Sequence, residues 1–555
     1  MELVQLGAKR QWRSGGDFPR YKASHDEEAR YDVSQEEKYG HHADHDYVEI
    51  CEGCRQHHRK RTRRIFKPLV DLSEYEKFCL HPTCLPSRYP LPCDLADVGS
   101  QGFVAIENVL HLSAADHPHI FDGDSERHDK DGHEYGGART LSNRDEAGLQ
   151  DNHGHLSYAQ KLMDCKLKIM ATRLKYGEDV WFLAAQLVNP YEILPYFAVR
   201  VLNRAFFKMW ELMQMFPGLV PLVATKPKLL SAHICEGPGG FVEAVCMRRS
   251  QHVEKARGFG MQDFTPDMDS TSNKEASDCW FAITLAVPGS QKDCMKMQMS
   301  RLKENRSKSV EGYVHYGADK SGDITNPNNI SSFVEFVLEK TCGEKMHLIT
   351  GDGAFDVSED FSSQEQSHAH LFFSEILIAA RLQSAGGALV LKIFDCFTEA
   401  TWTMLFILAS LYTTVEIVRL RTSRVCNSER FVVAQGFRLL SKGLEEKLMS
   451  ISRAWHQCTK DGLQAALKMY MPCPLPFLEA LGEGNAAIAS DQSTSILHAV
   501  SVAEDMGEKL SFAHASQQKS ILSILRRKMK TMELRRVNAL TICKALNIPL
   551  ASSVL

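Results

Sequence analysis

The chain has 555 residues, which is too long for one ordinary domain and predicts two to four folded units. Hydrophobic residues make up 44% of it, enough for a sizeable core, and the formal net charge of −4 excludes a uniformly basic coat for nucleic acid. The sixteen cysteines are scattered irregularly and the N-terminus lacks an apolar leader. We therefore expect mostly reduced thiols and a location in the cytosol or nucleus.

Residues 1–155 are polar and rich in histidine, and they predict an irregular, partly disordered N-terminal region. Its basic run Arg59–Arg64 is read as a solvated charge run, a nuclear import signal or a contact with an RNA backbone. Two cysteine pairs in the same region have spacings that a zinc site would permit, with ordinary thiols as the alternative. They are Cys51, Cys54, Cys79 and Cys84.

From Ser157 onward, apolar residues recur at helical spacing and predict two long helices as a lead-in to the next region. The second helix is expected to begin after Asn189-Pro190 and to carry one apolar face from Phe197 to Leu212. Pro217-Gly218 should end it.

Between about residues 229 and 437, short apolar stretches alternate with amphipathic ones. This alternation predicts an α/β fold with a mainly parallel sheet and helices on both faces. The expected strands are 229–235, 256–261, 313–316, 347–350, 388–394, 414–420 and 430–434, with helices at 240–248, 330–340, 370–382 and 398–411. Because no helix separates the last two strands, one of them is expected to be antiparallel, and residues 262–311 are interpreted as a polar insert.

The apolar stretch Trp402–Tyr412 is too short to span a bilayer, so we expect a buried helix there. After about residue 440 the pattern is helical, and it ends with a basic amphipathic stretch, Ser520–Arg536. That stretch is read either as a contact for RNA phosphates or as a solvated helix face.

The first expected strand leads directly into a glycine-rich turn and then a helix; the turn consists of Glu236, Gly237, Pro238, Gly239, Gly240 and Phe241. Glycines let a ligand approach the backbone closely, and the helix N-terminus adds free N–H groups. The turn matches neither the dinucleotide nor the phosphate-binding glycine motif. An acid before the turn and a proline within it suit a cationic ligand with an amino-acid tail, such as S-adenosylmethionine.

A second acid, Asp323, follows the expected strand at 313–316. At the carboxyl end of a strand it could accept a hydrogen bond from an adenine amino group or a ribose hydroxyl. The alternative is a helix cap, because a helix is expected soon after it.

Three ionisable residues lie at the ends of, or within, successive expected strands: Asp352, Lys392 and Glu429. Lys392 is the most informative, because it interrupts an apolar strand and an unpaired buried ammonium is costly. Such a lysine needs acidic partners or a depressed pKa. Burial and neighbouring cations lower the pKa of a lysine toward working pH, and a lysine so tuned can take a proton from a ribose hydroxyl. The alternative is a lysine on an edge strand whose charged end reaches solvent.

These motifs together resemble the FtsJ-type ribose 2′-O-methyltransferases, and several flanking motifs most resemble the eukaryotic cap-1 enzymes of that family. The flanking motifs are Asn189-Pro190-Tyr191-Glu192, Asn203-Arg204-Ala205 with Lys208-Met209, Gly258-Phe259-Gly260-Met261 and Gly322-Asp323-Ile324-Thr325. The resemblance covers roughly residues 185–437. It implies a Rossmann-like S-adenosylmethionine-dependent methyltransferase with a seven-stranded mixed sheet, in a domain at 156–440 followed by a helical extension at 441–555.

The resemblance also implies roles for individual residues. Lys208, Asp352, Lys392 and Glu429 match the catalytic tetrad of the family, in which the counterpart of Lys392 is the general base. Residues 236–241, Asp323 and Asp352 match positions that bind S-adenosyl-L-methionine, and the chemistry requires no metal. The implied substrate is the 5′ end of capped mRNA in the nucleus, with RNA polymerase or the capping machinery as further partners.

Three alternatives to a cap-1 enzyme stay open. The same tetrad serves enzymes that methylate the second transcribed nucleotide or ribosomal RNA. Position 236 is acidic here, whereas cap-1 enzymes often carry alanine there and cap-2 relatives more often carry an acid. An inactive, RNA-binding member of the family is the third alternative, although a scaffold has no need of a buried lysine.

Overall fold

A computed structural model of the chain describes residues 87–92, 152–222, 225–258, 278–286, 297–304, 310–354, 364–458 and 473–551. The basic run at 59–64 and the four cysteines of the zinc hypothesis lie outside these ranges. All described residues belong to one compact unit, Lys67–Leu555. The domain boundaries at 155 and 440 stay predictions.

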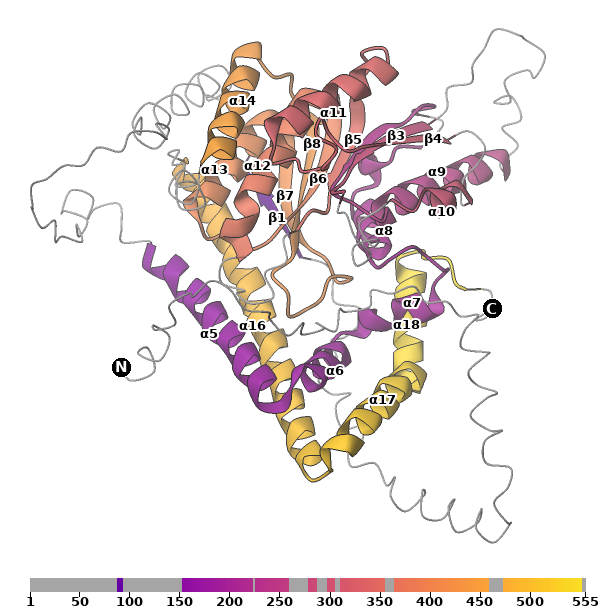
Figure 1. The fold of residues 1–555 in the computed structure, drawn as a ribbon, viewed down its shortest axis with the longest axis vertical. Helices are drawn as coiled ribbons and strands as arrows, with labels where there is room; N and C mark the ends of the chain where they lie inside the picture. The colour runs from indigo at the N-terminus through magenta and orange to yellow at the C-terminus, as the bar shows by residue number, and fades with distance from the viewer. Residues whose placement is uncertain are drawn as a thin grey trace, which may run out of the picture. The chain divides into compact units, whose positions relative to one another are not determined.

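The described core is built on an eight-stranded mixed sheet with the strand order β1-β7-β8-β6-β5-β2-β3-β4 (Figure 1). The strands are β1 Ser87–Leu91, β2 Leu230–Ile234, β3 Asp278–Ile283, β4 Val310–His315, β5 Met346–Gly351, β6 Gln383–Ile393, β7 Tyr412–Arg419 and β8 Arg430–Phe437. In this order, the neighbouring pairs β6–β5, β5–β2, β2–β3 and β3–β4 are parallel. β8 is antiparallel to both of its neighbours, β6 and β7. The predicted α/β fold with one late antiparallel strand is confirmed.

The eighth strand comes from the N-terminal region that the sequence predicted to be irregular. β1 pairs antiparallel with β7, and Arg88 forms a bidentate ion pair with Glu416 through nitrogen–oxygen distances of 2.7 and 2.8 Å. The sequence predicted seven strands because Ser87–Leu91 is short and its pairing partner lies more than 300 residues away. Such a strand gains its stability from the sheet edge that it covers.

The predicted strand at 256–261 was wrong. The helix α9 (Gly240–Gly258) continues through residues 256–258, and the second parallel strand is β3, which lies within the predicted insert at 262–311. β3 is the run Asp-Cys-Trp-Phe-Ala-Ile and is paired on both sides, with β2 and β4. A continuous apolar run is the pattern expected of such a strand, so the signal was present but obscured by the polar residues around it.

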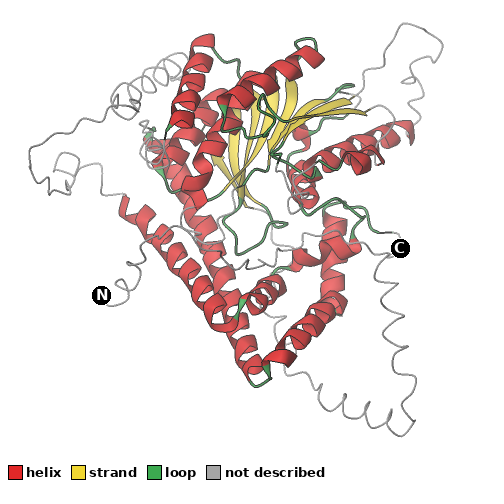
Figure 2. Ribbon diagram, viewed as in Figure 1, coloured by secondary structure: helices red, strands yellow, loops and turns green. Residues whose placement is uncertain are grey.

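Successive strand residues point to opposite faces of the sheet, and each face has its own helical layer (Figure 2). Ile349 packs in a core with α11 (Pro327–Lys340), α12 (Gln364–Leu382), α13 (Glu399–Leu411) and α14 (Lys442–Gln457). Leu348 packs in a second core with α8 (Ala205–Met215) and α9. The expected buried helix at 402–412 is thus confirmed as α13. Within the described part of the chain, no helix is long and apolar enough to cross a membrane.

The lead-in contains α5 (Asn152–Tyr176), α6 (Glu178–Val188), the 3-10 helix η3 (Pro190–Ile193) and α7 (Leu194–Phe197). The prediction of one helix from 190 to 216 was wrong, because α7 ends at Phe197 and α8 begins only at Ala205. The break has a tertiary cause. Ala198 forms a β-bridge with Leu550, and the Val199 N–H donates to Pro549 O over 2.7 Å.

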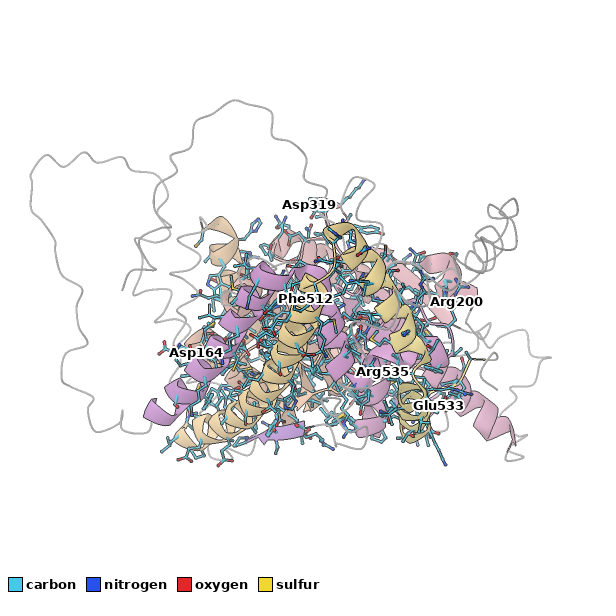
Figure 3. All side chains as sticks on the ribbon, turned by 90° about the horizontal axis from the view of Figure 1, so that it is seen from below. Asp164, Arg200, Asp319, Phe512, Glu533 and Arg535 are labelled. Carbon is cyan, nitrogen blue, oxygen red and sulfur yellow. The ribbon has the colours of Figure 1, made fainter. Side chains whose placement is uncertain are left out.

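The described residues after 440 are mainly helical, as predicted, and add α16 (Leu475–Ser511), α17 (Ala515–Thr531) and α18 (Glu533–Ala545). α16 and α5 lie side by side, close to the labelled Asp164 in Figure 3, and share an apolar cluster with α6. In the basic stretch, Arg526 pairs with Asp179 at 2.6 Å, and the buried Arg535 donates to Gln186 O at 2.7 Å. Arg526 and Arg535 thus join α17 and α18 to α6. A contact between the other basic residues of this stretch and RNA stays a prediction.

Candidate active site

The four predicted catalytic residues come from four different elements. Lys208 lies on α8, Asp352 directly follows β5, Lys392 is near the end of β6, and Glu429 directly precedes β8. β6 lies between β5 and β8, so the alternative of an edge-strand lysine is wrong. The carboxyl ends of parallel strands are where ligands bind in sheets of this kind.

The structure brings these four side chains together as two linked ion pairs, which we call the tetrad. Lys208 Nζ donates to Glu429 Oε2 over 2.7 Å. Lys392 Nζ lies 2.9 Å from Asp352 Oδ1 and donates to the Asp352 backbone oxygen over 2.7 Å. No side chain of the tetrad is more than 16% exposed, so these pairs are only weakly screened by water.

The charges of the two pairs also act on each other. Burial lowers the pKa of Lys208, but Asp352 and Glu429 together raise it above its usual value. Burial raises the pKa of Glu429, but Lys208 and Lys392 outweigh this effect and lower it to about 2. Lys208 and Glu429 therefore keep their charges at neutral pH, and the tetrad behaves as one electrostatic unit.

The segment between β7 and β8 is anchored to the same helix that carries Lys208. Glu211, one turn after Lys208, accepts hydrogen bonds from Thr422 N at 3.0 Å, Thr422 Oγ1 at 2.7 Å and Arg421 N at 3.1 Å. Ser423 Oγ then donates to Glu429 Oε1 over 2.5 Å. Sequence reasoning missed Glu211, although an acid on the apolar face of a helix was a visible signal.

Two motifs that carried the family resemblance also contact this segment. Asn189 Nδ2 donates to Ser423 O at 3.4 Å, and Arg421 donates to the Tyr191 hydroxyl at 3.1 Å. Arg204 donates to Thr422 O at 3.3 Å and forms an ion pair with Glu192. The motifs at 189–192 and 203–205 thus orient the chain that presents Glu429.

The glycine-rich turn is tightly packed at the end of β2. Gly239 has φ +113, a conformation that favours glycine, and its N–H donates to Glu236 O over 2.7 Å. Gly240 opens α9 and has no room for a Cβ, because Asn203 Oδ1 and the Phe206 backbone lie against it. Phe241 is fully buried, so its side chain belongs to the core and only its backbone can meet a ligand.

The carboxylate of Glu236 is directed into the protein. Its Oε2 lies 3.0 Å from His233 Nδ1, and its Oε1 accepts from Thr350 Oγ1. Burial raises the pKa of Glu236, while His233 and Thr350 oppose that rise. Both oxygens have protein partners and the side chain is 1% exposed, and a direct contact between Glu236 and a ligand stays a prediction.

Asp323 follows β4, as predicted, but does not cap the next helix. The N-cap of α11 is Asn326, whose side chain accepts from Asn328 N. Asp323 Oδ1 instead accepts from Thr325 N at 2.9 Å and Thr325 Oγ1 at 2.7 Å, which fixes the orientation of its carboxylate. The alternative of a helix cap was wrong, and the role in cofactor binding stays a prediction.

A further buried acid that sequence reasoning missed lies beneath the tetrad. Glu375 on α12 is fully buried, and a Cβ on Gly351 or Gly353 would come within 2.7 or 3.0 Å of its Oε1. Its carboxyl group therefore lies against the loop that holds Asp352. Burial raises the pKa of Glu375 well above its ordinary value; Lys392 opposes this rise, and Asp352 adds to it.

Substituting Glu375 by glutamine should stabilise the fold increasingly as pH rises. Because the pKa of Glu375 is higher in the folded chain than the ordinary 4.5, the folded chain keeps the proton of this carboxyl group at pH values where the unfolded chain has lost it. Folding stability from this group is thus present at low pH and is lost as pH rises above that ordinary value. Melting temperatures of Glu375→Gln and wild type between about pH 5 and 8 should diverge. Glu479→Gln, at an exposed position, is the control, and an equal, pH-independent shift in both variants would contradict the prediction.

Among the described residues, no group of three or more His, Cys, Asp and Glu side chains could hold a metal ion. The charged groups of the tetrad pair with each other instead. Groups paired in this way can hold charge in a nearly dry site and can take part in proton transfer.

Comparison with known proteins finds a family whose model matches the part of the chain that contains this site. The model of the FtsJ-like methyltransferase family matches residues 201–437. Over 279 residues the chain is 32% identical to the cap-specific mRNA (nucleoside-2′-O-)-methyltransferase 1 of Mus musculus, and the match covers 48% of this chain and 29% of the mouse protein. It is 27% identical over 283 residues to the inactive cap-specific mRNA (nucleoside-2′-O-)-methyltransferase 1B of Caenorhabditis briggsae, covering 50% of this chain and 30% of that protein.

Among solved structures, a Plasmodium falciparum chain described as a ribosomal RNA methyltransferase aligns with a TM-score of 0.27 and 14% identity. That alignment covers 42% of this chain and 97% of the other. The chain spans less than a third of the length of the curated relatives described above.

The residues that match the family model include the whole tetrad, the glycine-rich turn and all strands from β2 to β8. The family resemblance predicted from the motifs is thereby confirmed, and the curated relatives carry cap-specific names, as the flanking motifs predicted. Over residues 201–437, this chain matches the FtsJ-like methyltransferase family.

Proposed function

We propose that this chain is an S-adenosylmethionine-dependent enzyme that methylates the ribose 2′-hydroxyl of the first transcribed nucleotide of capped mRNA. The observation that carries the proposal is the tetrad, in which two lysines and two carboxylates are paired and buried at the carboxyl edge of the sheet. The cap as substrate is supported by the names of the relatives, which share about half of this chain.

The residues around the turn fit the cofactor. The Asp352 N–H donates to Ile234 O over 3.3 Å, so the loop that carries Asp352 is joined to the end of β2 beside the glycine-rich turn. α9 starts at Gly240, and the first N–H groups of a helix attract a carboxylate such as that of an amino acid. Bound there, S-adenosylmethionine would supply an electrophilic methyl group, with Asp323 and Asp352 as candidate hydrogen-bond acceptors.

The side chains of the tetrad then have distinct tasks. With its amine unprotonated, Lys392 Nζ would take the proton of the 2′-hydroxyl as that oxygen displaces S-adenosylhomocysteine from the methyl group, which is the work of a general base. Asp352, 2.9 Å away, stabilises the ammonium that results, and the Lys208–Glu429 pair holds the opposite side of the site. Much of the acceleration comes from holding the hydroxyl and the methyl group in line.

Transfer of labelled methyl groups to matched short RNAs tests the proposal. We expect methylation of a capped RNA, loss of that methylation when the first ribose already carries a 2′-O-methyl group, and little transfer to the uncapped RNA. Continued transfer to the premethylated RNA would instead identify an enzyme for the second nucleotide, and equal transfer to uncapped RNA would favour a ribosomal or other substrate. RNA binding without any transfer would contradict the proposal and favour an inactive binding protein.

A further inference from the structure

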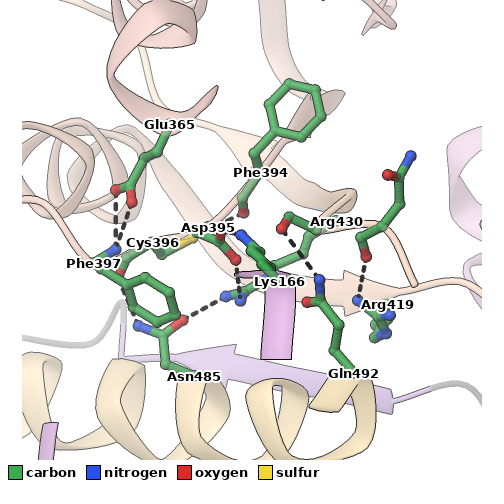
Figure 4. Close-up of polar contacts among 12 residues, drawn as sticks. Lys166, Glu365, Phe394, Asp395, Cys396, Phe397, Arg419, Arg430, Asn485 and Gln492 are labelled. Atoms are coloured by element: carbon green, nitrogen blue, oxygen red, sulfur yellow. Dashed lines mark hydrogen bonds and ion pairs between the residues drawn. The ribbon is translucent and has the colours of Figure 1, made fainter. Parts of the chain in front are cut away.

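We propose that α5 and α16 are positioning elements of the methylation site, although both lie outside the residues that match the family. They reach the site through buried polar side chains that anchor the segment after Lys392 and the segment around Glu429 (Figure 4). This inference rests on the proposed function, and it gives a role to part of the helical extension after residue 440.

The centre of this network is a carboxylate shared by two cations. Asp395 lies three residues after Lys392, and its Oδ2 is 2.6 Å from Lys166 Nζ of α5. Its Oδ1 is 3.1 Å from Arg430 Nη2. Arg430 directly follows Glu429 and pairs with Ile393 across the β6–β8 ladder, so the network touches both strands next to tetrad residues.

α16 completes the network with two amide side chains. Arg430 Nη1 donates to Asn485 Oδ1 over 2.5 Å, and Asn485 Nδ2 donates to Cys396 O over 2.6 Å. One amide therefore links the segments after Lys392 and after Glu429. Two turns along the helix, Gln492 Nε2 donates to Ser428 Oγ at 3.2 Å, on the other side of Glu429.

Burial makes these contacts energetically important. Arg430 and Gln492 are fully buried, and Lys166, Asp395 and Asn485 are at most 6% exposed. Burial raises the pKa of Asp395, but Lys166 and Arg430 outweigh it and lower the pKa below its usual value. Removing one partner of such a group leaves a buried charge or donor without compensation, which costs more than a lost surface contact.

The side chains from α5 and α16 contact residues at the ends of β6 and β8, which distinguishes this network from ordinary packing between two helices. The exposed Arg526–Asp179 pair also joins two flanking helices, α17 and α6, but its side chains are 41% and 55% exposed. Loss of that pair should therefore leave the site unchanged. Loss of the Lys166 or Asn485 contacts should displace the segments that present Lys392 and Glu429.

The test compares Lys166→Met and Asn485→Leu with Arg526→Ala in the full chain. At a temperature below the melting transition of every variant, we expect kcat for methyl transfer to capped RNA to fall about 10- to 100-fold in the first two, as for a small misplacement of catalytic groups. Binding of S-adenosylhomocysteine should stay within about threefold of wild type. Lys166→Arg, which restores the charge, should recover most of kcat, and Arg526→Ala should keep it.

A merely structural role would lower the melting temperature but leave kcat unchanged in the folded variants, and that outcome would overturn the proposal. A second measurement does not depend on the reaction: hydrogen exchange at residues 392–398 and 426–430 should be faster in Asn485→Leu than in wild type. If wild type transfers no methyl group but this difference is present, the proposed function fails and the anchoring role survives. Unchanged exchange in both segments would overturn the anchoring role itself.

Discussion

Replacement of Lys392 by alanine is expected to abolish methyl transfer while leaving cofactor binding largely intact. Nζ of Lys392 lies 2.9 Å from Asp352 Oδ1, deep enough to be nearly dry, and it is the proposed acceptor of the hydroxyl proton. A positioned general base contributes about 10²- to 10⁴-fold to a rate, so kcat should fall by that factor or more. The glycine-rich turn lies between the end of β2 and the first residues of α9 and does not include Lys392, so the dissociation constant of S-adenosylhomocysteine should change by less than about threefold.

The measurement is single-turnover transfer of a labelled methyl group, with cofactor binding followed separately by calorimetry. Lys392→Met keeps the length of the side chain, so a loss of rate in this variant is not caused by a cavity at residue 392. Lys509→Ala, at a surface pair whose lysine is 30% exposed, is the matched control and should behave as wild type. Full activity in either Lys392 variant would refute its assignment as the base.

Replacement of Glu211 by alanine should cause the largest loss of stability among single changes near the site. The carboxylate accepts hydrogen bonds from Thr422 N, Thr422 Oγ1 and Arg421 N, and Glu211 is 1% exposed. Each donor left unsatisfied in the interior costs about 1–3 kcal/mol, so the free energy of unfolding should fall by about 3 kcal/mol or more. Because the segment that it anchors also presents Ser423 to Glu429, kcat should fall as well.

Chemical denaturation and methyl transfer, measured on the same preparations, check both parts of this prediction. Glu445→Ala is the control, because Glu445 pairs with Arg381 at 2.9 Å but its side chain is 36% exposed, where an ion pair contributes about 0–1 kcal/mol. A loss in Glu211→Ala no larger than in this control would mean that the hydrogen bonds of Glu211 do not anchor the segment between β7 and β8.

Lys208 connects α8 to the end of the sheet at which the tetrad lies. Lys208 lies on α8, which packs against one face of the sheet. Its ammonium donates a hydrogen bond to Glu429, which is 221 residues away in the sequence. Glu211 holds the same helix to the chain before Glu429. Two contacts one helical turn apart thus fix both the spacing and the rotation of α8 relative to β8.

Several features of this protein are determined by local sequence. The α/β alternation, the glycine-rich turn at the end of β2 and the buried helix α13 follow from periodicity and from the conformational freedom of glycine. The positions of Asp352, Lys392 and Glu429 relative to their strands follow as well, because the carboxyl ends of the parallel strands β5 and β6 and the amino end of the antiparallel strand β8 lie along one edge.

Only the tertiary structure decided the remaining features, because each depends on partners that are distant in sequence. β1 is a strand because β7 offers an open edge, and the helix predicted from 190 onward breaks because Ala198 pairs with Leu550. Glu211, Glu375 and Asp395 acquire their roles from burial beside particular groups, and local pattern does not encode which groups those are. The sequence by itself determined which residues could carry out the chemistry, and packing decided what holds them in place, since the cost of an unpaired buried charge depends on every element that surrounds it.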